Sequence, residues 1–152
     1  MLSAATPNGQ GSIGVSASEI AQMLTVMQEG FTSLGDSAAV LTAAAIVGGN
    51  ILTSGGSTAI NLTTDTATNI INALTQSQEA TPRIGQTFPV FLTNLNTATA
   101  TVVAGSGVTL VGSGAVATSQ TTSFLGTITG TPQLGGTPAI SLQRMWSNGA
   151  AA

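Results

Sequence analysis

The stretch that decides the fold is residues 88–130, which read FPVFLTNLNTATATVVAGSGVTLVGSGAVATSQTTSFLGTITG. Short runs rich in valine, threonine and phenylalanine alternate with turn signals, namely Asn94–Asn96 and the Gly-Ser-Gly triplets at 105–107 and 112–114. Short strands with turn signals every 8–12 residues or less are typical of an all-β sandwich or barrel. The strands predicted here and in the segment that follows are Phe88–Leu92, Ala98–Ala104, Val108–Val111, Ala115–Thr118, Thr122–Thr129 and Ala139–Gln143.

The preceding segment continues the β pattern and adds helical structure. Thr42–Ile46 can form one helical turn, and Ser54–Ser57 is interpreted as a hairpin loop. A helix capped by Thr64 or Asp65 is predicted to run to about Gln76. The strands predicted in this segment are Ala39–Leu41, Asn50–Thr53 and Thr58–Leu62. The fold predicted for residues 37–152 is a mainly β, compact, antiparallel β-sandwich, jelly-roll-like, with one short helix inserted in the β body.

Residues 1–36 are predicted to form an N-terminal arm and an anchoring helix. The helix spans Ser16–Phe31, where Ser16 and Glu19 form a capping box. Apolar residues recur at helical spacing, so one face is apolar. An isolated amphipathic helix has no core of its own, so it either caps its own domain or binds a partner. The candidate partner-binding residues are Ile20, Met23, Leu24, Met27 and Phe31.

The composition excludes several classes of partner. Charged residues make up 5% of the chain, against about 25% in typical soluble domains. The only basic residues are Arg83 and Arg144, too few to neutralise a run of phosphates, so no nucleic-acid binding is expected. The longest apolar run, residues 38–49, is shorter than the roughly 20 residues that span a membrane, so no membrane anchoring is expected. A neutral, hydroxyl-rich surface favours self-association.

The residue inventory argues against an enzyme. The chain has no His, Cys or Lys, which removes the usual general base, the thiolate ligands and the commonest activated nucleophile pairs. Asp65 is interpreted as a residue of a helix start, where a negative charge suits the helix dipole. The Gly-x-Gly runs lie between strands, so they are interpreted as hairpin turns and not as phosphate loops. No catalytic residue, metal or cofactor is predicted.

Two residues near the C-terminus are candidates for an interface between subunits. Trp146 is the only tryptophan and either covers an edge of its own domain or contacts a neighbouring subunit. Arg144 is a candidate partner for an acidic residue of a neighbouring subunit. Phe88 and Phe91 lie in a predicted strand and are expected in the core, which leaves Trp146 as the one aromatic surface suited to a sugar.

The order of motifs from Ala38 to Met145 resembles a domain found in structural proteins of tailed phages and large marine viruses. Ala104–Gly112, AGSGVTLVG, matches the pattern A-G-x-G-V-x-L-x-G of that family. Ile84–Phe88, IGQTF, stands where the family has V-G-D-x-F, with Gln86 in place of the acidic residue. The resemblance implies a compact β-sandwich located in a virion, often on trimeric capsid-decorating or fibre-like parts, and it supplies no catalytic residue.

These observations lead to two functional hypotheses. The first is a capsid decoration or cement protein that forms homotrimers, binds the major capsid protein and stabilises the head shell. The alternative is a fibre component or a receptor- or glycan-binding module of a virion. Both hypotheses place the chain in the virion, and the first places it on the capsid surface.

Overall fold

The computed structural model divides the chain into residues 1–30 and 31–152 and describes residues 31–78 and 80–148. The predicted anchoring helix, with Ile20, Met23, Leu24 and Met27, lies outside the described residues. Phe31 is described, and 70% of its side chain is exposed. The body begins earlier than the predicted boundary after residue 36, because Thr32–Leu34 forms a strand that pairs with the next strand of the same sheet.

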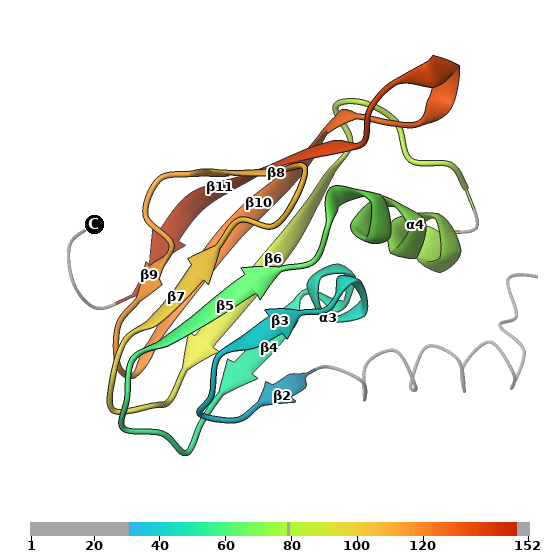
Figure 1. The fold of residues 1–152 in the computed structure, drawn as a ribbon. Coiled ribbons are helices and arrows are strands. Elements are labelled where there is room, and N and C mark those ends of the chain that lie inside the picture. The colour runs from blue at the N-terminus through green and yellow to red at the C-terminus, as the bar shows by residue number, and fades with distance from the viewer. Residues whose placement is uncertain (1–30, 79, 149–152) are drawn as a thin grey trace, which may run out of the picture. The chain divides into compact units, whose positions relative to one another are not determined.

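The described residues form a mainly β structure with two sheets (Figure 1). The six-stranded sheet has the order β2-β4-β6-β10-β11-β8, and the four-stranded sheet has the order β3-β5-β7-β9. The strands are β2 (Thr32–Leu34), β3 (Ala39–Leu41), β4 (Asn50–Thr53), β5 (Ile60–Thr64), β6 (Thr87–Asn94), β7 (Ala100–Val103), β8 (Val108–Val111), β9 (Ala115–Val116), β10 (Gln120–Gly130) and β11 (Ala139–Ser147).

Successive strands from β2 to β10 alternate between the two sheets. β2, β4 and β6 therefore stack in parallel in one sheet, and β3, β5 and β7 stack in parallel in the other. Five of the eight strand pairs are parallel. The expectation of an antiparallel, jelly-roll-like arrangement is therefore wrong for this part of the body. Antiparallel pairing holds for β6–β10–β11 and for β7–β9.

The Gly-rich loops are arches between sheets and not hairpins. The loop after β4 leads to β5, the loop at 105–107 leads from β7 to β8, and the loop at 112–114 leads from β8 to β9. In each case the two strands belong to different sheets, so the prediction of hairpins at these places is wrong. Both flanking strands bury one face in the same core, as Ile51 of β4 and Leu62 of β5 do.

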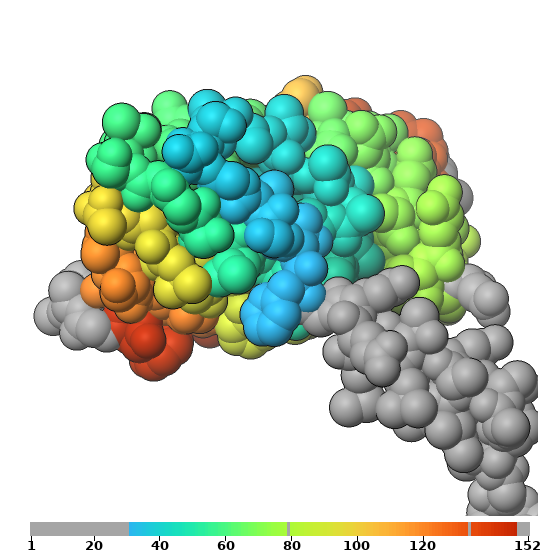
Figure 2. Space-filling view, turned by 90° about the horizontal axis from the view of Figure 1, so that it is seen from below, coloured from blue at the N-terminus to red at the C-terminus, as the bar shows by residue number. Residues whose placement is uncertain are grey.

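Successive arches lie against one another. Ser54 N–H donates to Leu34 O, Leu95 N–H donates to Thr53 O, and Thr97 N–H donates to Gly56 O. In Figure 2 the β4–β5 loop (green) and the β6–β7 loop (yellow) lie side by side at one end of the body. The side chain of Asn94 is fully buried within this stack. The arches are thus joined by hydrogen bonds between neighbours, as the strands are.

Two helices return the chain from the four-stranded to the six-stranded sheet. α3 (Ala43–Gly48) follows β3, α4 (Ala67–Gln78) follows β5, and the two helices pack together. The short helix predicted in the β body corresponds to α4, and the predicted helical turn at Thr42–Ile46 corresponds to α3. The buried face of α4 consists of Ala67, Ile70, Ile71 and Leu74.

Asp65 connects the starts of both helices. Its carboxylate accepts hydrogen bonds from Ala43 N at 3.1 Å, from Thr66 N at 2.8 Å and from Asn69 Nδ2 at 2.7 Å. The N-cap of α4 is Thr66, whose hydroxyl accepts from Asn69 N, so the predicted cap at Thr64 or Asp65 is displaced by one residue or more. The side-chain hydrogen bond from Asn69 holds the pKa of Asp65 below its ordinary value of 3.8, aided by the two backbone N–H groups and opposed by burial.

We expect Asp65→Ala to lower the free energy of unfolding at neutral pH by about 1–2 kcal/mol, because it removes the acceptor shared by both helix starts. A carboxyl group whose pKa is lower in the folded state stabilises the fold above its unfolded pKa and loses this contribution as the pH falls through the folded pKa. The difference between wild type and variant should therefore shrink below pH 3.8. Urea denaturation across this pH range measures it, with Asp36→Ala as the control in an exposed turn. A difference that is constant with pH would contradict the assignment.

Candidate functional site

The solvent-facing side of the six-stranded sheet is an uncharged surface whose members follow from the strand register. Alternate residues of each strand point to this side, and the register places them in rows across the sheet. We call this surface the outer face. Its members are Ser33, Asn50, Leu52, Thr87, Pro89, Phe91, Thr93, Thr109, Val111, Thr121, Ser123, Leu125, Thr127, Ser141, Gln143 and Trp146. None of them carries a charge.

Aromatic and aliphatic side chains are exposed on the outer face. Phe91 of β6 and Trp146 of β11 are both opposite Ser123 of β10, so the two aromatic residues share one row across three strands. Phe91 is 41% exposed, Trp146 57% and Val111 44%. Phe91, Val111 and Trp146 thus expose apolar surface on one side of the sheet, among uncharged polar residues.

A β-bulge places Trp146 on the outer face. The register between β10 and β11 shifts at this point, so that Arg144 is opposite Phe124 and Trp146 is opposite Ser123. Met145 is the extra residue on β11. In an unbroken register Met145 would lie opposite Ser123 and Trp146 opposite Thr122, whose side chain is buried. Bulges commonly re-aim a side chain in this way at sites of binding.

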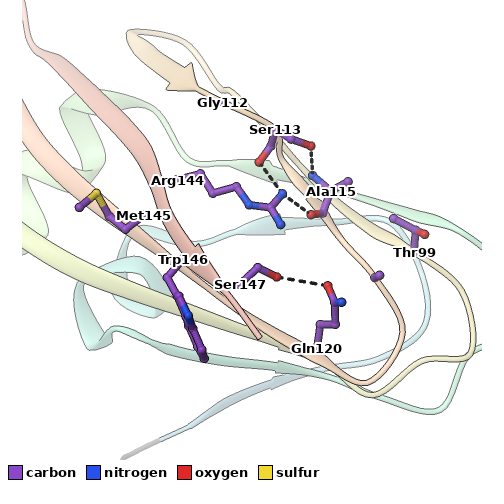
Figure 3. Close-up of a pocket in the computed structure, with 10 residues that line it drawn as sticks. Thr99, Gly112, Ser113, Ala115, Gln120, Arg144, Met145, Trp146 and Ser147 are labelled. Atoms are coloured by element: carbon purple, nitrogen blue, oxygen red, sulfur yellow. Dashed lines mark hydrogen bonds between the residues drawn. The ribbon is translucent and has the colours of Figure 1, made fainter. Parts of the chain in front are cut away.

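A pocket of about 500 Å³ opens beside the bulge (Figure 3). It exists because β8 pairs with β11 only as far as Val111 and Gln143, after which the chain crosses to β9 in the other sheet. Polar and apolar residues both line the pocket, and none of them is acidic. The lining residues are Thr99, Gly112, Ser113, Ala115, Ala117, Gln120, Arg144, Met145, Trp146 and Ser147.

Arg144 reaches across this pocket from β11 toward β9. Its Nη1 donates to Ser113 O at 3.2 Å and to Ala115 O at 2.8 Å, as Figure 3 shows. Its Nε is buried and has no hydrogen-bond partner among the described residues. On the other side, Ser147 donates to Gln120 Oε1 at 3.2 Å. Half of the guanidinium group is therefore committed to the fold, while the other half has no partner in the described part of the chain.

The predicted site residues are brought together only in part. Arg144 and Trp146 line one pocket, whereas Phe31 precedes β2, which lies at the opposite edge of the six-stranded sheet from β8. Phe88 is buried as predicted, but the prediction that Phe91 lies in the core is wrong. The two phenylalanines are three residues apart in one strand, so they point to opposite faces, and this spacing was the signal in the sequence.

The described residues contain no group of three or more His, Cys, Asp or Glu side chains with the proximity needed to hold a metal ion. The two described carboxylates, Asp36 and Asp65, belong to an exposed turn and to the helix starts, and neither lines the pocket. Within the same residues, no helix has the length and apolar character required to cross a lipid bilayer.

Comparison with known proteins gives no match to a family model, to a curated protein or to a solved structure. The resemblance to structural proteins of phages and marine viruses therefore stays a prediction drawn from the motifs of the sequence.

Proposed function

We propose that this chain is a non-enzymatic structural protein of a virion, which forms a homotrimer on the capsid surface, binds the major capsid protein and stabilises the head shell. The observation that carries the proposal is the uncharged outer face with Phe91, Val111 and Trp146 exposed on it. Burying such a face against another protein incurs no desolvation of charges and gains about 25 cal/mol per Å² of apolar area.

The architecture links segments of the chain that are distant in the sequence. Parallel stacking of strands and arches joins residues distant in the sequence by a continuous series of backbone hydrogen bonds. We infer that the two sheets pack face to face as a β-sandwich, since buried side chains of both belong to one core. In this proposal residues 1–30 provide a second contact with the shell, and several weak contacts on one lattice combine through avidity.

Cosedimentation with shells of the virus that encodes the chain tests the proposal. We expect the full chain to pellet with shells, and Phe91→Ser combined with Trp146→Ser to weaken this binding at least tenfold. The matched control is Val40→Ser on β3, because Val40 is 54% exposed and belongs to the other sheet. A chain lacking residues 1–30 keeps β2 intact and should also bind more weakly.

Two results would count against shell decoration. If the full-length chain stays in the supernatant at micromolar concentrations of shell protein, it does not decorate shells. If the Phe91/Trp146 double variant binds shells as strongly as the wild type, the outer face is not the docking surface. If the chain without residues 1–30 binds as strongly, the arm does not contribute to shell binding.

The alternative, a fibre component or receptor-binding module, is favoured by one specific observation. The pocket beside Trp146 combines apolar side chains with hydroxyl and amide groups in a volume of about 500 Å³, and ligand pockets commonly measure about 300–1,000 Å³. Saccharide binding by a chain that does not bind shells would favour this alternative over decoration.

A further inference from the structure

We propose that Arg83 of one copy pairs with Asp36 of the next copy, and that this contact, repeated around a three-fold axis, closes the homotrimer. The inference rests on the proposed trimer and names the two surface patches that form it. A cyclic trimer requires two such patches, because each of its interfaces joins two different parts of the same chain. Shell binding is measured separately, so decoration can stand where this contact fails.

The charges of the described residues leave one exposed cation and one exposed anion. The guanidinium group of Arg144 donates to two backbone carbonyl groups, and the carboxylate of Asp65 accepts three hydrogen bonds at the helix starts. Both charges are thus committed to the fold. Arg83 and Asp36, by contrast, are exposed. In the described part of the chain, they are therefore the charges that a second copy can reach.

Arg83 and Asp36 lie at opposite ends of the body (Figure 1). Asp36 follows β2, which runs parallel to β4 and β6, so it lies at the end where β6 finishes at Asn94. Arg83 precedes β6, which begins at Thr87. The eight residues of β6 span about 25 Å at the rise of a strand. Two residues so far apart cannot pair within one chain, but they can pair between copies arranged head to tail.

The turn that carries Arg83 has a fixed backbone conformation. Gln86 N donates to Arg83 O at 3.0 Å, and Arg83 N donates to Gln86 Oε1 at 3.1 Å. Gly85 has a φ of +90°, as the third residue of a type II turn requires, and its N–H donates to Ile128 O at 2.8 Å. Ile84, the second residue of the turn, is 66% exposed. The turn therefore presents a cation beside an aliphatic side chain, and its rigidity lowers the entropic cost of binding.

The patch around Asp36 has the complementary character. A Cβ atom on Gly56 would collide with Asp36 Cβ and would lie 3.4 Å from Asn96 Oδ1, so Asp36 and Asn96 both pack against Gly56. Leu95 precedes Asn96 in the β6–β7 arch and is 53% exposed. This end of the body thus offers one anion and one exposed aliphatic side chain, which match the cation and the aliphatic side chain at the other end.

The ion pair and the apolar contact have different roles in this interface. An exposed ion pair adds little affinity, but like charges brought together across an interface are strongly unfavourable. The charges therefore select the partner patch and its orientation. Burial of Ile84 and Leu95 against the facing copy removes apolar surface from water and favours association.

Charge reversal tests the pairing, with light scattering of the full-length chain as the measurement. Arg83→Glu brings two acidic side chains together at each interface, and Asp36→Arg brings two basic ones together. We expect each single variant to associate at least tenfold more weakly and to be monomeric at concentrations where the wild type is a trimer. The variant with both reversals restores opposite charges and should restore the trimer. Association of the wild type should also weaken as the salt concentration rises.

The matched control is Asn72→Glu, which adds a negative charge at an exposed residue in the middle of α4, outside both patches. It should associate as the wild type does. Circular dichroism verifies the fold of each variant. If a reversal disturbs the fold, Arg83→Gln and Asp36→Asn remove the charges instead, and each should weaken association at least threefold.

Three outcomes would overturn the inference. If the wild type is a trimer and either reversal leaves it intact, the subunits meet elsewhere, although the trimer itself stands. If both single variants dissociate and the double variant does not recover, Arg83 meets an acidic residue other than Asp36. If the wild type is a monomer, both this contact and the trimer are wrong, and cosedimentation decides separately whether the chain binds shells.

Discussion

Replacing Asn94 with leucine is expected to lower the free energy of unfolding by about 3–5 kcal/mol, because each buried group left without a partner costs about 1–3 kcal/mol. Asn94 is fully buried in the stacked arches. Its Oδ1 accepts from Thr53 Oγ1 at 2.9 Å and from Asn96 N at 3.0 Å, and its Nδ2 donates to Ala98 O at 2.9 Å and to Val116 O at 2.8 Å. Leucine has a similar volume but satisfies none of these four groups.

Urea denaturation of the purified variants measures the effect. The matched control is Asn61→Leu, since Asn61 is an exposed asparagine within β5. The control should change the free energy of unfolding by less than about 0.5 kcal/mol. A similar, small effect at both positions would show that the arches do not depend on the Asn94 network.

Replacing Gly105 with alanine is the second change with a large expected effect, about 2–4 kcal/mol of destabilisation. A Cβ atom at this position would lie 2.1 Å from Thr64 O and 2.9 Å from Asp65 O. Both are backbone atoms, and they cannot move freely because Thr64 belongs to β5 and its hydroxyl accepts from Gly105 N. Overpacking against backbone displaces whole segments, here the junction of β5 with α4.

Gly35→Ala is the control for this prediction, because nothing lies within 4 Å of the Cβ position at Gly35 and its φ is not positive. Thermal unfolding followed by circular dichroism should show a clear decrease in Tm for Gly105→Ala and little change for Gly35→Ala. Equal Tm values for the two variants would contradict the close packing of the 105–107 arch on β5.

The positions of the strands were predictable, whereas their pairing was not. Alternation and turn residues located all six strands predicted from residue 88 onward, because both signals are local. The pairing depends on whether a Gly-rich loop folds back in one sheet or crosses to the other, and such loops have the same composition in both cases. Stacking also left no sequence repeat, since Thr32 pairs with Ile51, 19 residues on, and Ile51 pairs with Leu92, 41 residues on.

The site was predictable to a smaller extent. Trp146 and Arg144 were identified because each is a rare residue in a chain of few aromatic and charged residues. The bulge at Met145 could not be predicted from the sequence, because an extra residue in a strand does not change the composition of that strand in a recognisable way. The outer face could not be predicted either, because it combines residues from six strands and the order of these strands in the sheet was not known from the sequence.

Light scattering of the full-length chain at low and high concentration tests the central claim most directly. The account predicts a stable species with three times the 14.9 kDa mass of one chain. A stable, soluble monomer at both concentrations would contradict the account of a trimer that decorates a shell.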